Sequence, residues 1–367
     1  MSCIPINDFS LITLCDATKA GKLYSIVPDS GAGDFDVTRA STATYLGSDG
    51  LLKTAANNEP RIEFNPDGSY KGLLVEPAAT NLALYSEEFD DAAWNKTNST
   101  ITLNTAISPN GASTASTLTA TASTGEHNIS FSLSEDSILR NRSVFVKKGT
   151  ARYVAFSVIP NLLSTGQRYT VFDLETGVIV RPGSDSRAGF GYVVRNYGNG
   201  WYRISFNGFG TTLTRGFTIG IVDDNFASSS SWTANGTETI FLYGAQLEVG
   251  TVATSYIPTV ASTVTRAADV ISKTNASALI SQGSGTILFR PLFDTPTEIN
   301  VMGIIATVTN EQMKLTYSAS KIELFANDTS VGVLNGTFDF TSLDKIELGN
   351  YEGDSQLDAH IQNFATI

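Results

Sequence analysis

The sequence of 367 residues contains few cysteines, few histidines and few charges. Its two cysteines, Cys3 and Cys15, have no neighbouring histidine or second cysteine pair that would complete a zinc site. We expect two reduced thiols, which form a disulfide only if the protein is later oxidised. The two imidazoles, His127 and His360, are not accompanied by a Gly-x-Ser-x-Gly motif, which argues against a Ser-His-Asp hydrolase.

Charged residues make up 16% of the sequence, and the formal net charge is −12. An acidic chain repels phosphates, so this composition argues against a sequence-independent nucleic-acid binder. No apolar run reaches the length of a membrane span, and residues 1–8 lack the basic and apolar segments of a signal peptide. We therefore expect synthesis in a cytoplasm, no membrane insertion and no nucleic-acid partner.

Hydroxyl side chains supply most of the polarity, with 43 Thr and 38 Ser residues. Thr, Val, Tyr and Phe favour strands, whereas a helical bundle needs more Ala, Leu, Glu and Lys. Apolar residues make up 41% of the chain and aromatic residues 10%, which is enough to build a core and argues against disorder. The composition predicts an all-β fold.

Turn signals recur at short intervals, and apolar and polar residues alternate with period two between them, as in antiparallel strands. The segment Trp201–Asn207, for example, places Tyr202, Ile204 and Phe206 on one face. Similar strands are predicted at 143–147, 153–158, 169–173, 217–222, 239–247, 286–293, 301–308, 321–326 and 345–349. Together they predict antiparallel β-sandwich modules of the jelly-roll type in tandem, with little helix.

Charge and a repeated motif suggest a division of the chain. Residues 269–367 hold 12 acids and 5 bases, whereas the middle of the chain is nearly neutral. The motif Val37-Thr38-Arg39-Ala40 returns as Val264-Thr265-Arg266-Ala267, so similar connectors flank the central block. We predict an N-terminal anchoring segment at 1–84, a central module at 85–260 and a C-terminal module at 261–367. The connectors suggest that the central module is inserted between outer parts that pack together.

Polysaccharide cleavage would need paired carboxylates. A retaining glycosidase holds two carboxyl groups about 5 Å apart, and no Glu-x-Asp-x-x-Glu run supplies such a pair on one strand. The acidic clusters Glu87-Glu88, Asp90-Asp91 and Asp223-Asp224 adjoin small or turn residues, which favours turn and capping roles. We expect no enzymatic activity and assign no catalytic residue.

Sugar binding requires an exposed aromatic ring beside amide, carboxylate or guanidinium groups. Trp201, Arg203 and Asn207 share one face of a predicted strand, and Trp232 lies in a run of hydroxyl residues. We select these four as candidate glycan contacts. The alternative for Trp232 is a ring that caps one end of a sandwich.

A basic stripe without acids covers residues 140–152; it consists of Arg140, Arg142, Lys147, Lys148 and Arg152. Such a stripe could bind an anionic ligand, either an acidic glycan or an acidic protein, or form an ordinary solvated strand face. Three carboxylates, Asp29, Asp34 and Asp36, alternate around glycines and are candidates for calcium, although their spacing matches no EF-hand. We expect no other metal and no cofactor.

A series of motifs in fixed order extends from about residue 20 to residue 290. The series comprises Lys22–Pro28, Gly33–Thr44, Asn58–Ile62, Gly72–Pro77, Thr80–Leu82, Tyr85–Phe89, Val146–Gly149, Gly198–Arg203, Gly244–Glu248, Ser255–Thr259 and Thr265–Asp269. It resembles the virion structural proteins of tailed bacteriophages, of the tail-fibre and head-fibre type. The order of the motifs is more specific than any one of them.

This resemblance implies a central jelly roll similar to carbohydrate-binding modules, followed by a shortened lectin-like sandwich of the concanavalin or laminin-G type. It implies a fibre at the virion surface, made in the bacterial host cytoplasm, with other virion proteins and host-surface polysaccharide as partners. Because fibres assemble with closed cyclic symmetry, we expect a homotrimer. Two alternatives stay open: a capsid decoration or head-fibre protein with a purely structural role, and a polysaccharide depolymerase.

Overall fold

The structure is a computed structural model. It describes residues 9–19, 21–133, 138–158, 169–182, 191–209, 215–226, 229–292, 297–301, 304–308, 311–338, 345–348 and 359–366. These residues form strands and turns and no helix, and their strands pair antiparallel. The all-β, antiparallel prediction is thereby confirmed.

The chain divides into two compact units. The outer module contains Met1–Ser48, Thr54–Ala78 and Arg266–Ile367, and the sandwich module contains Asp49–Lys53 and Ala79–Thr265. Strands from both ends of the chain share one sheet, so most of the segments 1–84 and 261–367 belong to a single unit. The sandwich module is inserted between them.

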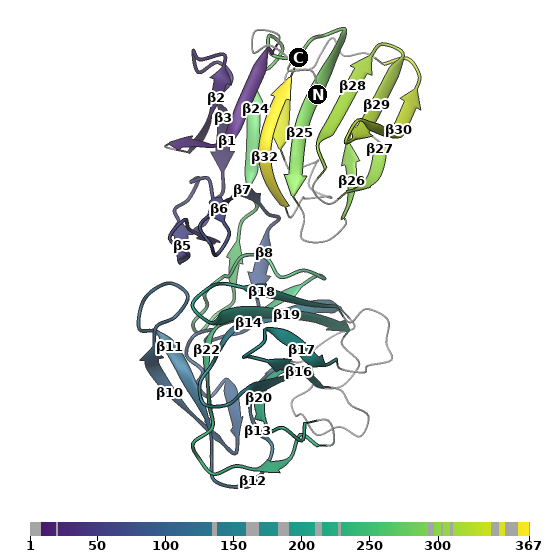
Figure 1. Ribbon diagram of the computed structural model, residues 1–367. Helices are drawn as coiled ribbons and strands as arrows, with labels where there is room; N and C mark the ends of the chain where they lie inside the picture. Colours follow the sequence, from purple (N-terminus) through teal and green to yellow (C-terminus); the bar gives the residue numbers. More distant parts are fainter. Residues whose placement is uncertain are drawn as a thin grey trace. The chain divides into compact units, whose positions relative to one another are not determined.

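The sandwich module consists of two six-stranded sheets (Figure 1). In spatial order, the first sheet contains β10 (Ser99–Ala106), β11 (Ala115–Ala120), β22 (Thr239–Val249), β14 (Leu139–Lys148), β19 (Trp201–Phe209) and β18 (Tyr192–Asn196). The second sheet contains β17 (Val178–Arg181), β16 (Tyr169–Asp173), β15 (Tyr153–Ser157), β20 (Arg215–Val222), β13 (His127–Leu133) and β9 (Trp94–Thr97). Each predicted strand between residues 143 and 247 lies within one of these strands or differs from it by one residue at an end.

Apolar side chains from both sheets fill the space between them. Ile204 and Phe206 of β19 contribute to this core and Tyr202 packs against it, so the predicted apolar face of that strand is confirmed. Trp94 is fully buried in the same core, with its ring centroid 5.0 Å from that of Phe89. Trp94 is the first residue of β9. Burial of such rings contributes most of the stability of a sandwich.

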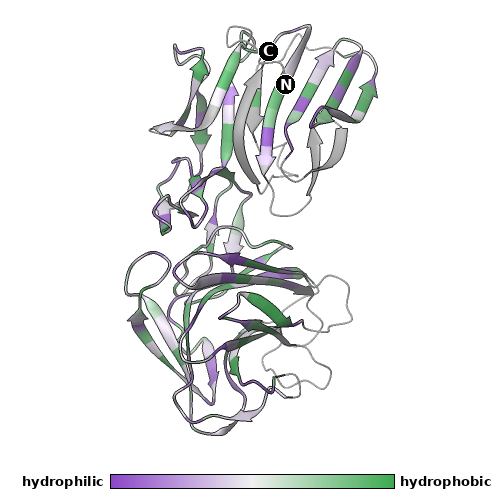
Figure 2. Ribbon diagram, viewed as in Figure 1, coloured by the Kyte–Doolittle hydropathy of each residue, from purple (hydrophilic) through white to green (hydrophobic). Residues whose placement is uncertain are grey.

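The outer module is built on a 12-stranded sheet. Its main path runs through β30 (Thr329–Asn335), β29 (Lys321–Ala326), β28 (Met313–Ser318), β25 (Ser284–Leu292), β32 (Ala359–Thr366), β1 (Leu11–Lys19), β2 (Lys22–Val27), β3 (Phe35–Thr38), β24 (Val270–Thr274) and β31 (Lys345–Leu348). β6 (Ile62–Phe64) and β7 (Tyr70–Val75) complete it beside β32. Figure 2 shows the alternation of hydrophobic and hydrophilic residues as bands along β28 and β29.

The C-terminal segment does not form a sheet of its own. β32 pairs with β25 on one side and with β1 and β7 on the other, so it joins strands from both ends of the chain. The single strand predicted at 301–308 is wrong: β26 (Thr297–Val301) and β27 (Ile304–Val308) are two strands that pair with each other. Residues 301–306 contain no polar side chain, so the sequence pattern did not separate the two strands.

The described residues also form three further two-stranded ladders. They are β4 (Ala43–Leu46) with β5 (Leu52–Ala55), β8 (Ala79–Asn81) with β23 (Val264–Arg266), and β12 (Thr124–Gly125) with β21 (Trp232–Thr233).

A buried ionic cluster of three arginines and two carboxylates lies in the outer module. Arg61 donates to Glu76 at 2.6 Å and also to Asp269. Arg39 pairs with Asp269 at 2.8 Å, and Arg266 lies 3.6 Å from Glu76. Burial alone lowers the pKa of Arg61, but the two carboxylates outweigh burial and raise it. All five side chains are at most 3% exposed. The cluster therefore connects, in the interior of the module, residues that are far apart in the sequence.

Candidate functional site

The strand face predicted to bind sugar is covered. Trp201 is only 2% exposed, and its indole nitrogen donates to the carbonyl of Ile107 at 3.1 Å. Arg203 is 3% exposed and donates to the carbonyl of Thr254 at 2.7 Å and to the hydroxyl of Ser143 at 2.9 Å. These bonds leave neither a broad exposed indole face nor a free guanidinium.

Asn207, the third residue of that face, holds two backbone segments. Its amide nitrogen donates to the carbonyl of Thr251 at 3.1 Å, and its amide oxygen accepts from the backbone nitrogen of Gly191 at 2.6 Å. Thr251 and Thr254 belong to the segment that follows β22, so this segment lies over the face. The sequence pattern identified the face correctly but gave no sign of its cover.

Trp232 lies at one end of the sandwich, where it is half-buried. Its indole nitrogen donates to the carbonyl of Ile221 at 3.1 Å, and its ring contacts that of His127 edge to face at 4.8 Å. The ring also packs against the core between the sheets. These contacts correspond to the capping alternative.

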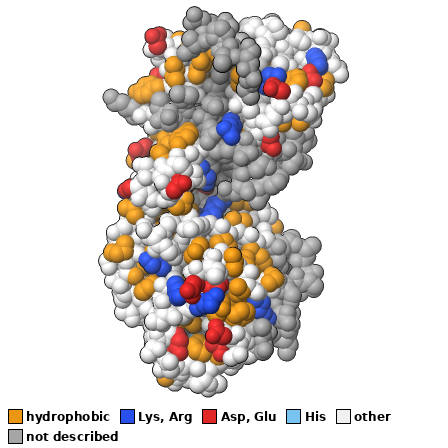
Figure 3. Space-filling model, in the orientation of Figure 1, with side chains coloured by type: hydrophobic (Ala, Val, Ile, Leu, Met, Phe, Trp, Pro, Cys, Tyr) orange, Lys and Arg blue, Asp and Glu red, His pale blue; other side chains and the backbone are white. Residues whose placement is uncertain are grey.

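The basic stripe does not form a single charged face. Arg140 and Arg142 are buried at 7% and 0% exposure. Lys148 pairs with Glu175 at 3.0 Å, and Arg152 pairs with Asp173 at 2.7 Å. In Figure 3, acidic and basic side chains lie next to one another on the visible face of the sandwich module. Lys147 is the only member of the stripe that lines a pocket identified in this module.

Arg152 and Asp173 form an ion pair with several hydrogen bonds. The guanidinium contacts both carboxylate oxygens, at distances from 2.7 to 3.1 Å. These hydrogen bonds hold the pKa of Asp173 at about 2, below its ordinary value of 3.8. Asp173 also caps the turn that follows β16 by accepting from the backbone nitrogen of Glu175. Arg152 therefore has a structural partner already.

The three carboxylates considered for calcium do not converge. Asp34 accepts from the backbone nitrogen of Ser25 at 2.9 Å, and Asp36 pairs with Lys22 at 3.2 Å. Among the residues that the structure describes, no group of three or more His, Cys, Asp or Glu side chains could hold a metal ion. Asp29 takes part in no such group.

The acidic and imidazole side chains considered for catalysis make contacts that are typical of structural residues. His127 is fully buried, with Nδ1 2.7 Å from the carbonyl of Asn98 and Nε2 3.4 Å from that of Trp232. Asp91 and Asp223 each bind a backbone nitrogen two residues further on, as expected of turn residues. The side chain of His360 lies outside the described residues.

An aromatic layer covers the outer face of the first sheet, opposite the core. Phe145 contacts Tyr197 edge to face at 4.8 Å, and Tyr243 and Tyr256 lie 5.9 and 6.0 Å away. Trp201 belongs to the same cluster. The layer forms a second, smaller apolar cluster on this face of the sheet.

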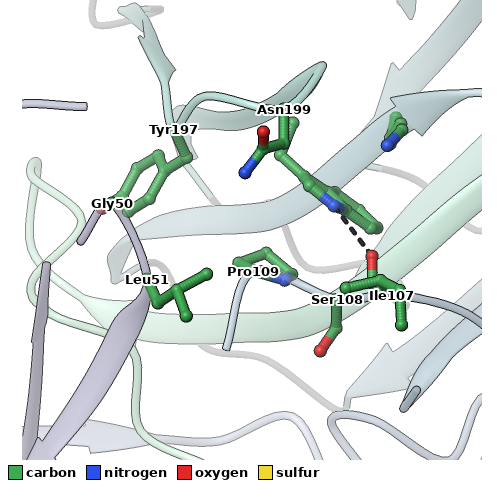
Figure 4. A pocket seen from close by; sticks show the side chains of 9 residues that line it. Gly50, Leu51, Ile107, Ser108, Pro109, Tyr197 and Asn199 are labelled. Atoms are coloured by element: carbon green, nitrogen blue, oxygen red, sulfur yellow. Dashed lines mark hydrogen bonds between the residues drawn. The ribbon is translucent and has the colours of Figure 1, made fainter. Parts of the chain in front are cut away.

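A pocket of about 220 Å³ opens at the edge of this aromatic layer (Figure 4). Three turns and the ends of two strands form it, with the lining residues Gly50, Leu51, Ile107, Ser108, Pro109, Lys147, Tyr197, Asn199 and Trp201. Figure 4 shows Tyr197 and Asn199 on one side and Leu51 and Pro109 on the other. Pockets for drug-sized ligands measure about 300–1,000 Å³, so this one is smaller than those.

The walls of the pocket are held together by backbone hydrogen bonds. The backbone nitrogen of Leu52 donates to the carbonyl of Pro109 at 2.9 Å, which joins two of the turns. In the third turn, Trp201 donates to the carbonyl of Gly198 at 2.8 Å. The first bond connects segments that are distant in the sequence, and the second closes the turn that carries Tyr197 and Asn199.

A chain of polar contacts leads from the pocket wall to a carboxylate. Ser108 donates to Asn110 at 2.6 Å, and Asn110 donates to the hydroxyl of Tyr243 at 3.1 Å. Tyr243 is hydrogen-bonded in turn to Glu87, which also accepts from Tyr256 at 2.9 Å. Burial raises the pKa of Glu87, against the effect of the two tyrosine hydroxyls.

Sequence reasoning missed Tyr197, Asn199 and Pro109 as site residues. Their motifs, Ser108-Pro109-Asn110-Gly111 and Tyr197-Gly198-Asn199-Gly200, carry strong turn signals. An aromatic residue beside an Asn-Gly turn was the available clue, since turns place such residues at the edge of a sandwich. Nothing local indicated that the two turns meet.

Comparisons with known proteins give no further guidance. No protein-family model and no curated protein matches the sequence. The part of the chain that the structure describes contains no helix long and apolar enough to cross a membrane.

Proposed function

We propose that the protein is a non-enzymatic fibre component of a tailed-phage virion, and that it binds a host-surface glycan in the pocket beside Trp201. The pocket carries the binding part of this proposal. It combines a phenol ring, a proline and a leucine with the amide of Asn199 and the ammonium of Lys147. Sugars present apolar C–H faces and polar hydroxyls, and this mixture matches both.

Binding is favoured over cleavage by the groups that line the pocket. None of the lining residues identified in the described part of the chain is Asp, Glu or His. Glycoside hydrolysis uses a pair of carboxyl groups on either side of the scissile bond. The carboxylate of the nearby Glu87 accepts a hydrogen bond from the hydroxyl of Tyr256. We therefore assign Glu87 a structural role beside the pocket.

The virion part of the proposal is supported by the ordered motifs between residues 20 and 290 and by the all-β fold. A single small pocket gives weak affinity. Several copies held together, as in a homotrimer, convert weak sites into firm attachment.

The glycan part is tested with the purified protein on an array of bacterial capsular, O-antigen and cell-wall polysaccharides. We expect at least one polysaccharide to be bound, and Asn199→Gly to weaken that binding. Glycine suits this position because the backbone of Asn199 has a φ of 52°. The matched control is Asn104→Gly, since Asn104 is exposed and has a φ of 56°. Absence of binding to every polysaccharide would contradict the glycan part.

The virion part is tested by antibody labelling of purified phage particles that encode this chain. Labelled fibres that also attach to host cells support the proposal. Antibody labelling of the capsid, together with a protein that does not bind host cells, would favour a structural decoration protein. Absence of the protein from the particles would overturn the virion part. Release of reducing ends from a bound polysaccharide would favour a depolymerase.

A further inference from the structure

Among the described residues that line the pocket, Lys147 is the only charged one. In the register of the first sheet it lies directly opposite Trp201 on β19 and Phe241 on β22. As a residue, Lys147 is partly buried, and within the described residues no carboxylate pairs with its ammonium group. A partly desolvated cation between aromatic neighbours interacts more strongly with an anion than a fully hydrated one does.

The neighbouring Lys148 provides a natural contrast. The side chains of successive strand residues point to opposite faces, so Lys148 leaves the pocket and pairs with Glu175 at 3.0 Å. Both side chains of that pair are exposed, at 39% and 54%. The two adjacent lysines therefore differ in their partners: Lys148 pairs with a carboxylate of the protein, and Lys147 does not.

We propose that the pocket selects a saccharide unit that carries an anionic group, with Lys147 as the residue that recognises the charge. This inference rests on the proposed glycan-binding function and deepens it. Tyr197, Leu51 and Pro109 contact the ring of the sugar, and the anionic group faces the ammonium. A carboxylate or a phosphate on the sugar has the required charge, and a neutral sugar leaves Lys147 unpaired.

Arg152 and Lys148 do not substitute for Lys147 in this role. Asp173 and Glu175 compensate their charges, so an incoming anion would have to compete with a carboxylate already in place. Glu175 also lies within 3.8 Å of Arg152. The specificity for charge is therefore assigned to one position.

The test compares each polysaccharide that binds in the array with its chemically neutralised form, by calorimetry. Carbodiimide and borohydride reduce carboxylates, and hydrogen fluoride removes phosphates, so the two treatments separate the two sources of charge. For the wild-type protein we expect one treatment to lower the affinity roughly 10- to 100-fold, the range for losing a charged hydrogen bond. Lys147→Gln removes this preference, whereas Lys147→Arg and the matched control Lys148→Gln retain it.

Two outcomes would overturn the inference. One is a set of bound glycans that are all neutral, or that bind equally before and after both treatments. The other is an equal loss in Lys147→Gln and Lys148→Gln, which would indicate an effect of overall charge. Either outcome leaves glycan binding itself intact, whereas failure of the proposed function means that no polysaccharide binds the wild-type protein. Unchanged thermal melting of Lys147→Gln verifies that the variant is folded.

Discussion

Arg39 and Asp269 are 230 positions apart in the sequence, and their side chains form a buried ion pair at 2.8 Å. Arg39 comes from the first copy of the Val-Thr-Arg-Ala motif and Arg266 from the second. Arg266 also reaches the cluster, 4.0 Å from the same carboxylate of Asp269. The repeated motif thus marks two arginines that converge on one acidic site.

Replacing Asp269 with alanine is predicted to destabilise the outer module severely. The change leaves three buried arginines with Glu76 as the remaining carboxylate of the cluster. Breaking a buried ion pair from one side costs about 3–5 kcal/mol, because the remaining charge is buried without compensation. Urea unfolding of Asp269→Ala measures this loss.

The matched control for that experiment is Asp36→Ala, which removes an ion pair with Lys22 in the same module. Both side chains of this pair are exposed, and such pairs contribute about 0–1 kcal/mol. Equal losses of unfolding free energy in the two variants would show that the buried cluster contributes no more to stability than the exposed ion pair.

Trp232→Phe is predicted to lower stability and leave glycan binding unchanged. The substitution keeps an aromatic ring beside His127 but removes the hydrogen bond from the indole to Ile221. Loss of one such bond costs about 1 kcal/mol. Thermal melting and array binding are measured on the same preparation, and loss of binding at unchanged melting temperature would relocate the sugar site to Trp232.

The pair of Arg152 and Asp173 predicts an acid-dependent loss of stability. The pKa of Asp173 is depressed to about 2, so its contribution is fully present above its ordinary pKa of 3.8 and is lost as the pH falls through about 2. Asp173→Asn should therefore melt at a lower temperature than the wild type at pH 6, and the gap should narrow between pH 4 and pH 2. A constant gap across that range would show that the charge of Asp173 contributes nothing.

Glu87 predicts the opposite dependence on pH. Its pKa is raised above the ordinary 4.5, chiefly by burial, so ionisation in the folded state destabilises the wild type as the pH rises through the raised value. Glu87→Gln cannot ionise and should lose less stability between pH 4 and pH 8. Unfolding free energies at the two pH values test this, with Glu88→Gln as the neighbouring control. If the unfolding free energy of Glu87→Gln falls as steeply with pH as that of the wild type, ionisation of Glu87 is not the cause of the fall.

Strands were predictable from the sequence where alternation and turn residues agree. The predicted strand 169–173 coincides with β16, and 321–326 coincides with β29. Alternation reports only that a face is apolar or polar, and it does not report what covers the polar face. That is why Arg203 could be placed on the correct face and still be expected in solvent.

The candidate site was less predictable, since it depends on convergence of turns that are distant in sequence. Leu51, Pro109 and Tyr197 belong to turns that local signals predict well. Their meeting depends on tertiary contacts such as the hydrogen bond from Leu52 to Pro109. Lys147 was selected for its charge, but its difference from Lys148 becomes visible only when Glu175 is placed.

The position of β32 determines when one ladder of the outer module can form during synthesis. Ile12 pairs with Ala365, so the ladder between β1 and β32 cannot form until residue 365 has been made. Every strand of the sandwich module's two six-stranded sheets has been made by residue 249. These strands are therefore available for pairing before β24 and β32, which pair with the N-terminal strands, have been made. Contacts of such long range slow folding. Strands whose pairing partners have not yet been synthesised are exposed to aggregation in the cell.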